Sequence, residues 1–120
     1  MAGISKVEDI DAWKESRVLT VAVYNITANG AWAKDFGLRD QIRRASVSIA
    51  SNIAEGFARE SDTEFARFLA IARGSAAEVK TQMYIASDLG YVDNETFNAI
   101  YDQIDRISRM ITGLIKYLRK

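Results

Sequence analysis

An apolar residue returns every three or four positions near the end of the chain, and this spacing constrains the fold more than any other feature. The row consists of Phe97, Ile100, Tyr101, Ile104, Ile107, Ile111, Leu114, Ile115 and Leu118. Residues three and four apart share one face of an α-helix, so the segment is predicted to form a long helix with one buried stripe. The chain contains no proline, the residue that most often breaks a helix.

Glycines and capping residues divide the rest of the chain into three more helices. We predict helices from Ser5 or Asp9 to Asn29-Gly30, from Leu38 to Glu55 with a stop at Gly56, from Asp62 to Asp88 with a stop at Leu89-Gly90-Tyr91, and from Asp93 or Asn94 to the end, with a connection from Ala31 to Phe36. Ser5 with Glu8, and Ser61 with Glu64, have capping-box spacing. Long helices with short links predict an all-α fold, an antiparallel up-down four-helix bundle, in a single domain over residues 1–120.

Several of these helices carry a second apolar row. On the first helix we assign the core row to Ile10, Trp13, Val21 and Tyr24, which leaves Leu19, Val23 and Ile26 opposite. On the third helix Ile71, Ile85 and Leu89 lie away from the Phe65 row, and on the second helix a further row is Val47, Ala50 and Ala54. Gly74 lies on the same side as Ile71, and a glycine inside a helix indicates close approach by another helix. The rows predict a homo-oligomer; the alternative is a wide core stripe with ordinary surface apolar residues.

The composition excludes most catalytic and metal chemistry. The chain has neither cysteine nor histidine, which excludes a zinc site, a cysteine nucleophile and a Ser-His-Asp triad. We therefore expect no enzyme, no cofactor and no metal. The N-terminal residues MAGISKVEDIDAW are unlike a secretory signal, and no apolar stretch approaches the roughly 18 residues of a membrane span. These features predict a cytoplasmic protein that does not associate with membranes.

A polar row follows the second helix beside its apolar row. Its members are Gln41, Arg44, Ser48, Asn52 and Glu55, and the third helix offers Arg73, Ser75 and Glu78 as partners. Serine and asparagine are poor choices in mid-helix, so their side chains are expected to have another use. The first interpretation is a structural polar network of Gln41, Ser48, Asn52, Glu55, Ser75 and Glu78. The second is a phosphate site, in which Arg43, Arg44 and Arg73 bind phosphate and Asn52 and Gln41 position it. The third is a carboxylate site at Glu55 and Glu78.

Basic residues gather at the C-terminus, although the chain as a whole is neutral, with sixteen basic and sixteen acidic residues. After Asp105 the tail has no acidic residue and carries Arg106, Arg109, Lys116, Arg119 and Lys120. One interpretation is a cationic helix end that complements the helix dipole. The other is a contact with nucleic acid, for which the candidate residues are Arg43, Arg44, Arg73, Arg109, Lys116 and Arg119.

The runs QIRRASVSIASNIAEGFAR and EFARFLAIARGSAAEV closely resemble a small bacterial "four helix bundle protein" family. That family includes proteins encoded in intervening sequences of large-subunit ribosomal RNA genes, and it is similar to accessory proteins of diversity-generating retroelements. The resemblance covers nearly the whole chain and implies a homopentamer; in the retroelement branch it implies binding of nucleic acid and a reverse transcriptase. Ala50 stands where the family usually has proline, and the connection from Ala31 to Phe36 lacks the usual Phe-Pro.

Three functions follow from these features. The leading hypothesis is a non-enzymatic homo-oligomeric scaffold or adaptor that contacts RNA or DNA. The alternative is a module that docks a partner polypeptide without nucleic acid, which salt would weaken far less. The third is an enzyme that uses the row of arginine, asparagine and glutamate side chains.

Overall fold

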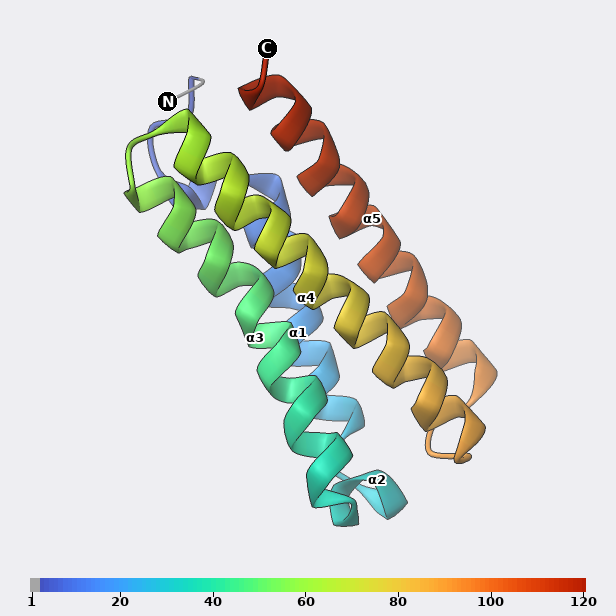
Figure 1. Cartoon of the computed structure of the whole chain (residues 1–120). Coiled ribbons are helices and arrows are strands. Elements are labelled where there is room, and N and C mark those ends of the chain that lie inside the picture. Colours follow the sequence, from blue (N-terminus) through green and yellow to red (C-terminus); the bar gives the residue numbers. More distant parts are fainter. Residues whose placement is uncertain (1–2) are drawn as a thin grey trace.

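A computed structural model describes residues 3–120, and the first two residues of the predicted domain lie outside the described residues. The elements are a short 3-10 helix at Val7–Asp9, α1 at Asp11–Ile26, α2 at Gly30–Lys34, α3 at Phe36–Ala58, α4 at Asp62–Asp88 and α5 at Asn94–Leu118 (Figure 1). All regular elements of the described residues are helical, so the predicted all-α class is confirmed.

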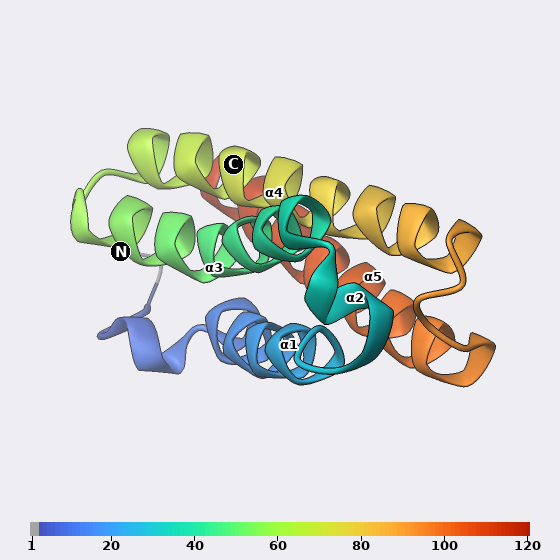
Figure 2. The ribbon, with the colours of Figure 1, turned by 90° about the horizontal axis from the view of Figure 1, so that it is seen from below.

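The four long helices lie side by side in an elongated body of 44 × 21 × 19 Å. Helix α3 packs against α4 on one side and α1 on the other, and α5 packs against both α4 and α1. Figure 2 shows α3 lying between α1 and α4. The order around the core is therefore α1, α3, α4, α5.

Local signals in the sequence set the ends of α4 and the start of α5. The Ser61 hydroxyl accepts the Glu64 N–H at 3.3 Å, and the Asp93 carboxylate accepts the Thr96 N–H at 2.7 Å. Gly90 has a φ of +76°, and the N–H of Tyr91 reaches back to the Ala86 carbonyl at 2.9 Å. This left-handed stop needs glycine. The predicted bounds Asp62–Asp88 are confirmed, and of the two predicted caps of the last helix, Asp93 and Asn94, the structure has Asp93.

The predicted boundaries of the first two helices are partly wrong. Helix α1 ends at Ile26, and the predicted connection from Ala31 to Phe36 contains most of the short helix α2. Its Trp32 is 1% exposed and belongs to the core. Gly56 does not stop α3, which continues to Ala58; a Cβ at this position would lie 2.5 Å from Phe68 Cβ. Gly56 is therefore a packing residue at the crossing of α3 and α4.

The predicted faces of the first helix are also wrong. Leu19 and Val23 are completely buried, whereas Val21 is 60% and Tyr24 is 42% exposed. The reason is Ile10, which is buried but precedes the helix in an extended conformation, with φ −85° and ψ 112°. Its burial carries no information about the rotation of α1. The core face of α1 is the row predicted to be left over, and the outward row is Val18, Val21 and Tyr24.

Candidate functional site

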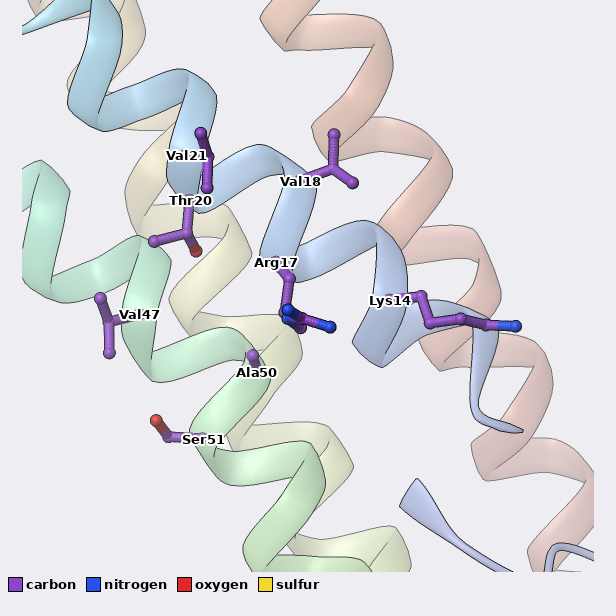
Figure 3. A pocket seen from close by; sticks show the side chains of 8 residues that line it. All are labelled: Lys14, Arg17, Val18, Thr20, Val21, Val47, Ala50 and Ser51. Atoms are coloured by element: carbon purple, nitrogen blue, oxygen red, sulfur yellow. The ribbon is translucent and has the colours of Figure 1, made fainter. Parts of the chain in front are cut away.

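An apolar groove lies on the surface between α1 and α3 (Figure 3). Its volume is about 770 Å³. It is lined by Lys14, Arg17, Val18, Thr20, Val21, Val47, Ala50 and Ser51. Val18, Val21 and Val47 are 56%, 60% and 42% exposed. Branched apolar side chains exposed together in a hollow are typical of an interaction surface.

The outward face of α4 is the second apolar surface. Ile71, Ile85 and Leu89 are 42%, 44% and 53% exposed. Gly74 is exposed on the same face, and a Cβ built on it would meet no atom within 4 Å. Packing within the subunit therefore does not explain a glycine that weakens the middle of a helix. Because Gly74 and Ala77 are both small, no bulky side chain projects from this part of the α4 face.

A polar groove of about 400 Å³ lies between α3 and α4, and the predicted polar row borders it. The hydroxyl oxygens of Ser48 and Ser75 are 2.9 Å apart. The Asn52 amide donates to the Ser48 carbonyl at 2.8 Å and to the Ser48 hydroxyl at 2.9 Å. These bonds explain why serine and asparagine occur in mid-helix here, because each side chain bonds across the helix pair or to the preceding turn.

All but one of the remaining members of the predicted row lie around this centre. Gln41, Arg44 and Glu78 line the same groove as Ser48 and Ser75. Glu55 lies apart from them: its carboxylate pairs with Arg59 at 3.1 Å, on an exposed part of α3. The polar row thus consists of a hydrogen-bonded centre, a charged rim and one separate surface ion pair.

Gln82 is a polar residue of this groove that the sequence analysis missed. It is only 8% exposed, and its Oε1 has no hydrogen-bond partner among the described residues. It follows Ser75 by seven residues, two helical turns, and this spacing places both on the α3 side of α4. That periodicity was the signal available in the sequence. A buried acceptor without a partner is unusual in a folded protein.

The candidate arginines differ in whether their side chains already bond to other groups of the same subunit. Arg43 donates to the Thr27 hydroxyl at 2.9 Å, and its guanidinium lies 4.5 Å from the centre of the Tyr24 ring. Arg109 is 3.4 Å from the Asp105 carboxylate. Arg73 is exposed, yet it donates to the Thr112 hydroxyl at 3.1 Å and so connects α4 to α5.

Three candidate cations make no ion pair among the described residues. Arg44, Lys116 and Arg119 are exposed, and no ion pair joins any of them to a carboxylate within residues 3–120. Arg44 lies on the α3–α4 groove. Lys116 lies one turn beyond Thr112, the partner of Arg73, so Arg73 and Lys116 share the α4–α5 side.

The pKa shifts point to structural roles at helix ends. A hydrogen bond from Arg67 lowers the pKa of Glu64, and hydrogen bonds from Thr96 lower the pKa of Asp93. A hydrogen bond to Asp35 raises the pKa of Tyr91. None of these groups lines the two grooves. Within the described chain, no three acidic side chains come together as a metal-binding group.

No helix formed by residues 3–120 is long and apolar enough to cross a membrane.

Comparisons with known proteins agree with the fold. The model of a family described as 23S rRNA-intervening sequence protein matches residues 8–113. A solved structure from Bacteroides thetaiotaomicron, described as a protein with unknown function from the S23 ribosomal protein family, superposes with a TM-score of 0.81. It is 24% identical in sequence, and the match covers 88% of this chain and 95% of that chain. No curated protein matches the sequence.

Proposed function

This chain belongs to the 23S rRNA-intervening sequence protein family, and we propose that it is a non-enzymatic subunit of a homo-oligomeric scaffold or adaptor. Each subunit is an antiparallel four-helix bundle, and the number of copies expected from the family resemblance is five. No catalytic activity is defined for the family, so neither groove is assigned a catalytic role. A module that docks a different polypeptide is the alternative use of the same surfaces.

The observation that carries this proposal is the pair of apolar surfaces. One is the α1–α3 groove, which exposes Val18, Val21 and Val47. The other is the α4 face with Ile71, Ile85 and the unexplained Gly74. Burying both against copies of the same chain removes apolar area from water and gives the glycine a use, because it lets another helix approach closely.

Gly74→Leu tests the assembly. We expect the wild type to show the mass of an oligomer in light scattering at micromolar concentration, and Gly74→Leu to shift toward the monomer. Within the subunit the new side chain meets open space, and leucine favours a helix over glycine by roughly 0.8 kcal/mol. The variant should therefore fold at least as well as the wild type.

Gly113→Leu is the matched control for this test. Gly113 is also an exposed helical glycine with no atom within 4 Å of a built Cβ, but it lies on α5. It should leave the oligomer intact. A monomeric wild type would contradict the proposal and favour the module that docks another polypeptide.

A contact with RNA or DNA is the second candidate function. The observation that favours it is the line of cations on the α4–α5 side, where Arg73 meets Thr112 and Lys116 follows one turn later. Arg119, three residues further, continues the line toward the end of the helix. An oligomer would repeat these cations, so that weak single contacts act together.

Fluorescence anisotropy with a structured RNA and a duplex DNA tests this contact. We expect binding that weakens steeply as salt rises, because phosphate contacts release counterions. The double variant Lys116→Glu with Arg119→Glu should lower the salt slope by about 1 for each lost phosphate contact. The same charge change at the exposed Lys6 and Lys34 is the control. Absence of binding at low salt would assign these cations a structural role.

A further inference from the structure

We infer that the α4–α5 side of the subunit binds single-stranded nucleic acid, with a base stacked on Tyr84 and phosphates bound by Lys80 and Arg73. This inference rests on the proposed contact with RNA or DNA and deepens it, because it names the strandedness of the ligand and the ring on which a base stacks. A duplex hides the faces of its bases, so a stacking surface selects an unpaired strand.

Three aromatic rings, which we call the aromatic cluster, meet where α4 and α5 approach the turn between them. The ring centre of Tyr84 is 5.1 Å from that of Phe97 and 6.3 Å from that of Tyr101, and both contacts are edge-to-face. Phe97 packs against the core, but Tyr84 is 48% exposed and Tyr101 lies outside the core cluster. Packing of the core therefore does not account for the two tyrosines.

The aromatic cluster presents Tyr84 as an ordered stacking surface. Stacking on an aromatic side chain strengthens the binding of a single strand whatever its base sequence, because every base has a flat face. A ring that its neighbours already hold in place loses little side-chain entropy when a base covers it. Nearly half of the surface of Tyr84 is open to such a base.

Cations without carboxylate partners extend from the aromatic cluster along both helices. The ammonium of Lys80 lies 4.8 Å from the centre of the Tyr101 ring, and Arg73 precedes Lys80 by two helical turns on the same side of α4. Arg73 donates to Thr112 of α5, and Lys116 follows one turn later. None of these three cations forms an ion pair within residues 3–120. A phosphate backbone complements unpaired cations that flank exposed aromatic rings.

The α4–α5 side is long enough for several nucleotides. From Tyr101 to Arg119 it extends about 27 Å along α5, which corresponds to roughly eight nucleotides stacked about 3.4 Å apart. Asp105 lies on this stretch, one turn after Tyr101, and its carboxylate is 3.4 Å from Arg109. Because this charge is paired within the subunit, it repels a phosphate less than a free carboxylate does.

The proposed self-association uses a different side of α4. Tyr84 and Ile85 are adjacent in sequence and point about 100° apart around the helix axis, and the same holds for Arg73 and Gly74. Ile85 and Gly74 belong to the apolar α4 face assigned to contact with another copy. One helix can therefore contact a second subunit and a nucleic acid strand together, and an oligomer repeats the strand-binding side.

Tyr84→Ala tests the stacking in fluorescence anisotropy with a labelled strand of about twelve nucleotides. At moderate salt we expect the single strand to bind at least about fivefold tighter than the duplex of the same sequence, and Tyr84→Ala to weaken single-strand binding by about fivefold or more. The salt slope should not change, because no charge is lost. Tyr84→Phe keeps the ring and should bind within about twofold of the wild type.

Tyr117→Ala is the matched control. Tyr117 is 52% exposed, and the ammonium of Lys120 lies 5.9 Å from its ring centre, but it lines a hollow on the α1 side of α5 together with Asp9 and Asp11. It should leave single-strand binding unchanged. Lys80→Met is a second variant and should reduce the salt slope by about 0.7, the value for one phosphate contact on a single strand.

An RNA strand and a DNA strand are both measured, because bases and phosphates are common to both, and the tighter ligand identifies the natural strand. Circular dichroism and light scattering check that each variant keeps the helix content and mass of the wild type. Duplex binding as tight as single-strand binding, or a Tyr84→Ala protein that binds like the wild type, overturns the stacking and leaves the contact with nucleic acid intact. Absence of binding to strand and duplex at low salt overturns both.

Discussion

Gly56→Val is expected to lower the free energy of unfolding by about 3 kcal/mol, one of the two largest effects we predict for a single substitution. A Cβ at Gly56 would lie 2.5 Å from Phe68 Cβ and 3.3 Å from Phe65 Cδ1. The first of these atoms is fixed to the α4 backbone and cannot turn away, so α3 and α4 must separate. Because this pair of helices shares the most extensive contact of the fold, separation exposes much of the core.

Urea denaturation followed by circular dichroism measures this loss. Gly113→Val is the matched control, because the same substitution on α5 meets no atom within 4 Å and also replaces a helical glycine. It should leave the midpoint unchanged or raise it slightly. All proteins are compared at one subunit concentration, since the stability of an oligomer depends on concentration. Equal midpoints for the two variants would show that the α3–α4 crossing adapts to a side chain.

Gly56 also shows where sequence reasoning about helix ends fails, whereas α4 shows where it succeeds. The ends of α4 were predicted because the signals are local: Ser61 bonds a residue three positions away, and Gly90 takes a φ that other residues avoid. The role of Gly56 depends on Phe68, which is distant in sequence. A glycine required by another helix and a glycine that ends a helix have the same appearance in a sequence.

The error on α1 has a related cause. Apolar rows occur on both sides of this helix, so the pattern alone allowed two rotations, and Ile10 favoured the wrong one. The spacing was correct, yet the choice of face depends on the neighbouring helices. The missed Arg43 contact has the same origin, because its partner Thr27 is sixteen residues earlier and beyond the end of α1. The sequence is enough to find candidate cations. It does not show which of them already bond to other groups of the same subunit.

The polar groove was predictable in part. Helical spacing placed Ser48 and Asn52 on one face and named Ser75 as a partner from the next helix, and these three side chains form the hydrogen-bonded centre of the groove. The burial of Gln82 was not evident, because glutamine occurs commonly on exposed helix faces. The groove therefore shows how polar periodicity identifies a face while leaving the depth of each side chain undetermined.

Trp32→Ala is expected to lower the free energy of unfolding by roughly 3–5 kcal/mol, as for other fully buried tryptophans. Trp32 is 1% exposed and lies in α2, a helix of only five residues. Its ring centre is 6.2 Å from that of Tyr91, whose hydroxyl donates to Asp35 at 3.0 Å. Trp32 thus packs the connection between α1 and α3 against the turn between α4 and α5. Removing it leaves a cavity and frees both connections.

Trp32→Phe and Trp13→Ala separate the causes of this loss. The Nε1 of Trp32 is buried without a partner among the described residues, so phenylalanine removes an unsatisfied donor and should cost much less than alanine. Trp13 is half-buried, and Trp13→Ala should cost about 1 kcal/mol, near the average for single substitutions. The unfolding midpoints of all three variants give the comparison. If Trp32→Ala lowered the free energy of unfolding no more than Trp13→Ala does, α2 would contribute little to stability. The four long helices alone would then stabilise the core.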